Sequence, residues 1–415
     1  MTSPADQALW RPYTQMKTAP PPLEAVRTHG SRIVLADGRE LVDGVASWWT
    51  AAHGYNHPHI LQAMSRQLEA MPHVMFGGLT HAPAERLARR LAALLPGALN
   101  HVFFSDSGSV SVEVALKAAL QVWLNRGVEG RTRFLSFRGG YHGDTLATMS
   151  VCDPEEGMHR RFGAALASQV IADLPRTREQ VQALDALMAA HRHELAAVIV
   201  EPLLQGAGGM LVHPPEVLAE VARLAHRHGL LLVADEVFTG FGRTGTMFAC
   251  EQAGVIPDLI CLSKALTGGV MGLAATVATT EVFEAFWSDD PAAALMHGPT
   301  FMANPLACAA ADASLDLFAA EPRLQQAAAV GRTLAQGLAP LRGAPGVVEV
   351  RGLGAMGAVQ LARPVDLAAL RARLLDRGVW VRPFGDIVYL TPALNIAAGD
   401  LDHLLEAVVA SVGGG

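Results

Sequence analysis

The chain has 415 residues, of which 51% are hydrophobic and 17% charged, and its formal net charge is −7 at pH 7. This balance predicts a folded chain with a large core, and it argues against disorder and against nucleic acid as a partner. No stretch offers the roughly 18 consecutive apolar residues of a membrane span, and the N-terminal MTSPADQALWRPYTQMK lacks the apolar core of a secretion signal. We therefore expect a cytoplasmic protein with four reduced cysteines. Without a cysteine pair or an H-E-x-x-H motif, we expect no metal site.

The hydrophobic pattern predicts an alternation of strands and helices. Residues 83–95 read as an amphipathic helix, and residues 110–123 as a helix that is apolar nearly all round and therefore buried. The expected strands cover residues 102–104, 133–137, 197–200, 230–234 and 259–262, and a further helix covers 217–228. Short, wholly apolar strands separated by helices indicate a mostly parallel sheet with helices on both faces.

The chain is expected to divide into a large and a small domain. Residues 56–308 form the large domain with the parallel sheet, residues 309–415 form a C-terminal small domain, and residues 1–55 form an N-terminal segment that joins the small domain. The small domain is predicted to be α+β, because an alanine-rich helical region follows about residue 305. Its short strands are expected at 347–350, 357–361 and 379–382.

Polar residues follow three of the expected strands. A serine-rich turn with Gly108 and Ser109 leads into the buried helix, Asp235 ends the strand near residue 234, and Lys264 follows the strand that ends at residue 262. Ligands bind beyond the carboxyl ends of the strands in such a sheet, so these residues should share one edge. At the start of a helix, Gly108 and Ser109 would offer free N–H groups to an anion.

A phosphate site, an acid and a lysine are the groups that pyridoxal phosphate requires. Lys264 would form a Schiff base with the cofactor aldehyde, and Asp235 would keep the ring nitrogen protonated. Partial burial would lower the pKa of the lysine amine and make it a nucleophile. Tyr141, just beyond the strand at 133–137, would stack on the ring. Taken singly, each residue also has an ordinary structural interpretation, as a cap, a turn residue or a surface lysine.

Two stretches match the G-x-G-x-x-G pattern of dinucleotide-binding proteins, at residues 240–245 and 352–357. The dinucleotide fingerprint has to bridge a strand and a helix directly. Residues 235–239 separate the first stretch from its strand, and the second stretch leads into another expected strand. Hydride transfer is therefore a minor alternative.

Longer motifs extend these observations along nearly the whole chain, from about Trp10 onward. They include WWTAAHGYNHP, SDSGSVSVEVALK, GYHGDT, IVEPLLQGAGGM, ADEVFTGFGRTG and LSKALTGG. These motifs resemble the class III aminotransferases of the pyridoxal phosphate fold type I family, and WRPYT, SWW, HGPTFM and VRPFG point to its biotin-pathway branch. The resemblance implies a large domain with a mostly parallel central sheet, a small α+β domain, and a homodimer with shared active sites.

The resemblance also implies roles for single residues in cofactor binding. Lys264 would be bonded to pyridoxal phosphate and would move the substrate proton, while Asp235 pairs with the ring nitrogen and Tyr141 stacks on the ring. The phosphate would be bound by Gly108 and Ser109, and from the neighbouring subunit by Pro299 and Thr300.

For the substrates, the biotin branch implies a ping-pong transfer through pyridoxamine phosphate. S-adenosylmethionine would give its amino group to 8-amino-7-oxononanoate, which becomes 7,8-diaminononanoate. Arg382 would bind the substrate carboxylate, Trp48 and Trp49 would form an apolar wall unless they serve core packing, and Tyr13 would meet the substrate amine or the donor. Arg243 and Gly298 complete the expected substrate-binding set.

Two departures from the family pattern bear on substrate choice. Phe238 stands where a small residue is expected, and residues 390–395 lack the aromatic residue expected there. Lysine as the amino donor therefore stays open, as does a general ω-aminotransferase acting on diamines or ω-amino acids. A cofactor-binding protein without catalysis is a further alternative, which nothing in the sequence supports.

Overall fold

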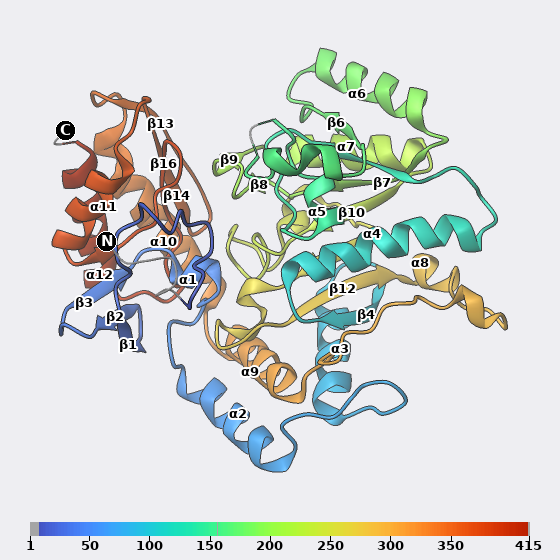
Figure 1. Cartoon of the computed structure of the whole chain (residues 1–415), viewed down its shortest axis with the longest axis horizontal. Coiled ribbons are helices and arrows are strands. Elements are labelled where there is room, and N and C mark those ends of the chain that lie inside the picture. Colours follow the sequence, from blue (N-terminus) through green and yellow to red (C-terminus); the bar gives the residue numbers. More distant parts are fainter. Residues whose placement is uncertain (1–7, 156, 414–415) are drawn as a thin grey trace.

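The computed structural model of the chain describes residues 8–155 and 157–413. Its larger part is built around a seven-stranded sheet of order β4-β12-β11-β10-β7-β5-β6 (Figure 1). Its strands are Leu99–Ser105 (β4), Arg133–Phe137 (β5), Val170–Ala172 (β6), Leu195–Val200 (β7), Leu231–Asp235 (β10), Leu259–Leu262 (β11) and Ala274–Thr279 (β12). Strand β12 is antiparallel to both neighbours and the other strands run parallel, which confirms the predicted sheet.

Helices cover both faces of this sheet, and β10 shows how the sequence pattern produces the two layers. Leu231 and Val233 pack in one hydrophobic cluster, while Leu232 and Ala234 pack in another, because successive side chains of a strand point to opposite faces. Every residue of β7, β10 and β11 is buried. The first cluster includes α4 (Gly108–Asn125), and the second includes α3 (Ala82–Leu94), α6 (Arg178–His191), α7 (Pro215–Arg227) and α9 (Pro305–Ala320).

The smaller part combines both ends of the chain. A four-stranded sheet of order β1-β2-β3-β15 pairs N-terminal strands with a C-terminal one, and Figure 1 shows the blue N-terminal strands beside the red C-terminal helices. A second sheet has the order β13-β14-β16. The strands are Ala25–His29 (β1), Arg32–Leu35 (β2), Glu40–Asp43 (β3), Val347–Leu353 (β13), Met356–Leu361 (β14), Val379–Trp380 (β15) and Ile387–Leu390 (β16). The helices are Arg323–Leu338 (α10), Leu367–Asp376 (α11) and Ala398–Val412 (α12).

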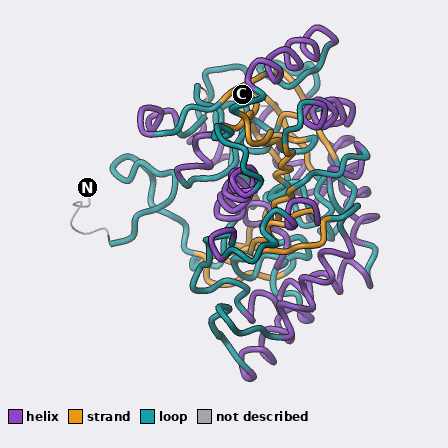
Figure 2. Tube along the Cα trace, turned by 90° about the vertical axis from the view of Figure 1, so that its right-hand side faces the viewer, coloured by secondary structure: helices purple, strands orange, loops and turns teal. Residues whose placement is uncertain are grey.

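The remaining α-helices and strands are mostly short. They are Ala46–Trp49 (α1), Pro58–Ala70 (α2), Leu146–Ser150 (α5), Thr280–Glu284 (α8) and the hairpin strands Leu204–Gln205 (β8) and Leu211–Val212 (β9). Seen from the side, the strands lie at the centre of the molecule with helices around them (Figure 2). Within the described part of the chain, no helix combines the length and the apolar character needed to cross a membrane.

Neither G-x-G-x-x-G stretch takes the dinucleotide-binding form. The first lies in consecutive turns, followed by the 3-10 helix Ala249–Ala253. The second contains the tight turn between β13 and β14, where Leu353 pairs with Met356. Because neither stretch leads from a strand directly into an α-helix, the structure agrees with setting hydride transfer aside.

Candidate active site

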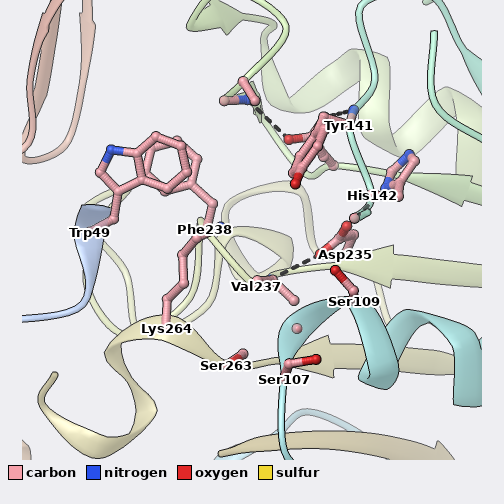
Figure 3. Close-up of a pocket in the computed structure, with 15 residues that line it drawn as sticks. Trp49, Ser107, Ser109, Tyr141, His142, Asp235, Val237, Phe238, Ser263 and Lys264 are labelled. Carbon is pink, nitrogen blue, oxygen red and sulfur yellow. Dashed lines mark hydrogen bonds and ion pairs between the residues drawn. The ribbon is translucent and has the colours of Figure 1, made fainter. Parts of the chain in front are cut away.

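A cavity of about 190 Å³ lies at the carboxyl ends of the parallel strands (Figure 3). Its walls are made by Trp49, Ser107, Gly108, Ser109, Tyr141, His142, Gly143, Glu201, Gly206, Ala207, Asp235, Val237, Phe238, Ser263 and Lys264. Five predicted cofactor residues therefore line one cavity, as expected for residues that follow strand ends: Gly108, Ser109, Tyr141, Asp235 and Lys264.

Lys264 lies in the cavity because β11 ends just before it, at Leu262. Its Nζ is 4.5 Å from the centre of the Trp49 ring. Removal from water lowers the pKa of the amine to about 8, although the carboxylates of Asp235 and Glu201 act in the opposite direction. A lysine of this kind is neutral, and hence nucleophilic, in a useful fraction near neutral pH.

The glycines after Lys264 let the backbone pass close to α1. Gly269 has a φ of +88°, and a β-carbon there would lie 2.9 Å from the backbone of Ala51. A side chain at this position would therefore push α1, and Trp49 with it, away from the lysine. This close approach explains why the strand that carries the lysine continues into small residues.

Asp235, the last residue of β10, is 5% exposed. Its Oδ2 lies 2.8 Å from Nδ1 of His142, and its Oδ1 accepts a hydrogen bond from the N–H of Val237 at 3.1 Å. The His142 ring is also buried. A buried carboxylate fixed in this way is suited to hold a cationic N–H group inside the cavity.

The N-terminus of α4 forms the anion-binding side of the cavity. Ser107 caps the helix by accepting a hydrogen bond from the N–H of Val110 at 3.3 Å. At Gly108 a β-carbon would lie 2.7 Å from a methyl group of Val237, so glycine leaves the helix start open. The Ser109 Oγ accepts from the N–H of Asp144 at 3.1 Å. Free N–H groups and the helix dipole at such a terminus attract an anionic group.

Tyr141 (Figure 3) and Glu201 also line the cavity. The Tyr141 N–H donates to Glu201 Oε2 at 3.0 Å, and the tyrosine hydroxyl donates to Asp144 at 2.9 Å. Glu201 follows β7 directly and also accepts from the N–H of Gly206 at 3.0 Å. Burial raises the pKa of the Glu201 carboxyl to about 7.

An aromatic wall closes the side nearest the small sheets. The Trp49 ring lies 4.1 Å from the ring of Phe238 and 6.0 Å from that of Tyr389, between centres. The unexpected phenylalanine therefore contributes to the wall of the cavity. Tyr389, immediately before the stretch 390–395, packs against Trp49 but does not itself line the cavity.

Three predicted substrate residues gather just outside the cavity. The Tyr13 hydroxyl lies 2.5 Å from Oδ2 of Asp144, and its ring makes an edge contact with Trp48 at 6.1 Å. The guanidinium carbon of Arg382 lies 5.3 Å from the centre of the Trp48 ring. Tyr13, Trp48 and Arg382 thus form one contiguous group, connected to the cavity wall through Asp144 and Tyr141.

The structure does not bring the other predicted residues into the cavity of this chain. Gly298, Pro299 and Thr300 lie outside it, in a segment without helix or strand after the 3-10 helix Pro291–Ala293.

Arg243 is buried and likewise does not line the cavity. Its Nη1 donates to the carbonyl oxygens of Ala355 and Pro392, both at 2.9 Å. Burial lowers the pKa of its guanidinium to about 10.

Three ionisable residues at or beside the cavity are not singled out by the sequence patterns: His142, Asp144 and Glu201. Glu201 directly follows a wholly apolar run, as Asp235 does, so its position at a strand end is the sequence signal for it. His142 and Asp144 flank Gly143 in the GYHGD stretch that carries Tyr141. Their position next to Tyr141 in the sequence is the feature that points to them as site residues.

The chemistry of the cavity fits pyridoxal phosphate. The α4 N-terminus suits a phosphate, the buried Asp235 suits a protonated ring nitrogen, and the Lys264 amine suits an aldehyde. The α4 N-terminus, Asp235 and Lys264 lie around one cavity. Each is suited in charge to a different part of the cofactor: the phosphate, the ring nitrogen and the aldehyde.

Comparisons with known proteins agree with this chemistry. The chain is 48% identical over 414 residues to an adenosylmethionine-8-amino-7-oxononanoate aminotransferase of Mycobacterium leprae, covering 98% of this chain and 95% of the relative. It is 43% identical to the protein of that name from Synechococcus elongatus, covering 98% of each. A crystal structure of the enzyme so named from Methanocaldococcus jannaschii has a TM-score of 0.94 at 32% identity, covering 98% of this chain and 96% of that one.

A solved amine transaminase from an uncultivated Pseudomonas species, in its pyridoxal phosphate-bound form, has a TM-score of 0.91 at 34% identity, with 98% of each chain covered. The family model for aminotransferase class-III matches residues 13–412. The chain therefore belongs to the class-III aminotransferase family.

Proposed function

We propose that the protein transfers an amino group from S-adenosylmethionine to 8-amino-7-oxononanoate, which yields 7,8-diaminononanoate for biotin synthesis. The observation that carries this proposal is the meeting of Lys264, Asp235 and the α4 N-terminus in one cavity, with Trp48 and Arg382 next to it. The names of the most similar relatives support the choice of substrates.

The residues of the cavity have separate roles in cofactor binding and proton transfer. The N–H groups at Gly108 and Ser109 hold the cofactor phosphate, and Asp235 keeps the proton on the ring nitrogen. Tyr141 packs against the ring. When bound, pyridoxal phosphate withdraws electrons from the substrate carbon that bears the amino group. The Lys264 Nζ takes the proton from that carbon and, in the second half of the reaction, returns a proton to the acceptor carbon.

The group formed by Tyr13, Trp48 and Arg382 outside the cavity is assigned to substrate binding. Arg382 binds the acceptor carboxylate, because a guanidinium offers paired donors to two oxygens. Trp48 contacts the alkyl chain, and Tyr13 meets the substrate amine beside Asp144. Donor and acceptor enter the same place in turn, in a ping-pong order. Arg243 supports the substrate-binding region indirectly, through its hydrogen bond to the carbonyl oxygen of Pro392.

The assembly we infer is a homodimer in which each copy completes the other's site. Gly298 and Thr300 are exposed on this chain, and Pro299 lies between them, so the segment is free to reach a neighbouring subunit. There, Pro299 and Thr300 contact the phosphate and Gly298 the substrate. Four buried free cysteines are compatible with a cytoplasmic location.

We retain the proposed division of the chain into domains. Residues 1–55 join the small domain formed by 309–415, and residues 56–308 form the large one. The pairing of β3 with β15 supports this grouping, since it places an N-terminal and a C-terminal strand in one sheet.

The visible absorbance of the purified holoenzyme tests the function directly. S-adenosylmethionine should remove the band of the lysine-bound cofactor, and 8-amino-7-oxononanoate should restore it. A response to lysine alone would keep the acceptor and change the donor. If neither donor changes the band and ornithine or 4-aminobutyrate does, the protein is a general ω-aminotransferase. Cofactor binding without transfer from any donor would contradict an enzymatic role.

A further inference from the structure

Four successive residues of α1 have left-handed backbone conformations. The φ angles of Ala46, Ser47, Trp48 and Trp49 are 45°, 48°, 54° and 76°, and ψ is 57° at Ser47 and 52° at Trp48. Residues with a β-carbon are unfavourable in this region, which is usually visited by single Gly, Asn or Asp residues. A complete left-handed turn without glycine is strained, and it persists only where surrounding contacts hold it.

This left-handed turn is what presents the two tryptophans. Trp49 is buried and faces the cavity, with its ring centre 4.5 Å from Nζ of Lys264 (Figure 3). Trp48 is 40% exposed and lies against Tyr13 and Arg382. Trp49 thus lines the cavity, while its neighbour Trp48 belongs to the group formed with Tyr13 and Arg382 outside it. Relaxation of the turn to ordinary backbone angles would redirect both rings.

The carboxylate of Asp43 holds the turn from inside. Its Oδ1 accepts a hydrogen bond from the N–H of Val45 at 2.8 Å. Its Oδ2 accepts from the N–H of Ser47 at 2.8 Å and from the hydroxyl of Tyr55 at 2.5 Å. The Tyr55 hydroxyl also lies 2.7 Å from Ser47 Oγ. Convergent N–H groups of this kind form an anion-binding concavity, which here receives the chain's own carboxylate.

Asp43 is itself fixed by the sheet. It is 1% exposed, ends β3, and is paired in register with Trp380 of β15, two residues before Arg382. The N–H of the next residue, Gly44, donates to the Trp380 carbonyl at 2.9 Å. One buried acid therefore connects the strand that leads to Arg382 with the turn that carries Trp48.

We propose that Asp43 is a positioning residue, which together with the Tyr55 hydroxyl holds residues 46–49 in the left-handed turn. It thereby sets Trp49 against Lys264 and Trp48 against Arg382. The inference rests on the proposed function only in its kinetic readout, because the geometry of the tryptophans can be followed without substrate.

The test uses fluorine NMR of the full-length holoenzyme labelled with 5-fluorotryptophan, with Trp48→Phe and Trp49→Phe to assign the two signals among six tryptophans. Asp43→Asn should displace or broaden both signals and lower kcat/KM at least about tenfold, while Trp123 and Trp287 stay unchanged. Tyr55→Phe should displace the same two signals less. The matched control is Asp400→Asn, which removes a carboxylate paired with Arg32 of the same sheet and should move neither signal.

A second substitution distinguishes loss of the strained turn conformation from a general loss of stability. Glycine adopts positive φ without penalty, so Ser47→Gly added to Asp43→Asn should return both signals toward their original positions. It should also recover at least about half of the lost activity on a logarithmic scale. Unchanged tryptophan signals in Asp43→Asn, or no recovery by glycine, would overturn the proposal. If Asp43→Asn does not fold, unchanged signals in Tyr55→Phe overturn it. If no tested donor reacts with the wild type, the proposed function fails and the NMR result still decides this inference.

Discussion

The Nδ1 atom of His142 lies 2.8 Å from Oδ2 of Asp235, and both side chains are almost completely buried. The backbone N–H of His142 in turn donates to Sγ of Cys152 at 3.1 Å. The histidine therefore has a fixed position from which it orients the acid at the end of β10. If Asp235 pairs with the ring nitrogen of the cofactor, as proposed, the strength of that pairing should depend on the His142 contact, because the contact fixes the direction of the buried carboxylate.

Replacing either member of this pair should lower the rate without unfolding the protein. Asp235→Asn is expected to reduce kcat at least about 100-fold, because it removes the charge that faces the cavity. His142→Ala should reduce kcat by about 10- to 100-fold, the range that corresponds to one hydrogen bond to a charged group. Steady-state kinetics with circular dichroism on both variants checks this. A His142→Ala enzyme with wild-type kcat would show that the histidine contact to Asp235 has no part in the reaction.

Loss of Lys264 should abolish turnover and leave the fold intact. The sequence contains three lysines, at positions 17, 117 and 264. Borohydride reduction of the holoenzyme followed by peptide mass spectrometry should place the cofactor on Lys264 alone. Lys264→Ala should lose both the attached cofactor and activity, while the exposed Lys17→Ala should keep both. Substantial turnover in Lys264→Ala would refute the assignment of this lysine.

The rate at which the apoenzyme takes up pyridoxal phosphate should rise with pH and level off above about 8. The reason is that the neutral amine of Lys264 is the reactive form, and its pKa is lowered to about 8 by burial. Glu201 acts against this shift, so Glu201→Gln should move the profile to lower pH. Stopped-flow absorbance measures the rate. A profile that is flat across this range would contradict a titrating lysine as the attacking group.

Much of the site could be predicted because it follows from strand ends. Two strands, Arg133–Phe137 and Leu259–Leu262, have the predicted bounds, since each is a short apolar run with clear polar or glycine-rich borders. In a parallel sheet, ligands bind beyond the carboxyl ends of the strands. Asp235 and Lys264 can therefore be predicted from their positions after two apolar runs of the sequence.

Other features depend on contacts that local sequence does not encode. Strand β12 was missed because AATVAT is alanine-rich, and alanine is a poor strand former whose place here is decided by its neighbours in the sheet. Arg243 was expected at the substrate, but its environment is decided by Ala355 and Pro392, more than 100 residues away. The left-handed turn of α1 runs against the preference of every residue in it.

The contacts of Asp144 predict a common effect of two substitutions outside the cavity. Asp144 accepts hydrogen bonds from the hydroxyls of Tyr13 and Tyr141, so it fixes both rings where the substrate amine is expected. Tyr13→Phe and Asp144→Asn should each raise KM for the amino donor by about tenfold, and the double variant should cost no more than the worse single one. Kinetics of the donor half-reaction checks this. Fully additive losses would show that the two residues act independently.

Glu201 should make the stability of the protein depend on pH in a defined direction. Burial raises the pKa of this carboxyl from 4.5 to about 7, so the fold favours its protonated form. Its contribution is fully present below about pH 4.5 and is lost as the pH rises through about 7, with a total of about 3 kcal/mol. Glu201→Gln cannot ionise and should show a flatter dependence of the thermal midpoint between about pH 5 and about pH 8.

The comparison isolates Glu201 because Glu236, whose pKa burial also raises to about 7, is present in both proteins and contributes equally to both slopes. The exposed Glu24→Gln serves as the matched control and should leave the wild-type dependence unchanged. Differential scanning calorimetry at several pH values provides the midpoints. Equal pH dependence in the wild type and in Glu201→Gln would mean that Glu201 is already ionised in the folded protein at low pH. In that case a counter-charge in the cavity, and not burial, would govern its titration.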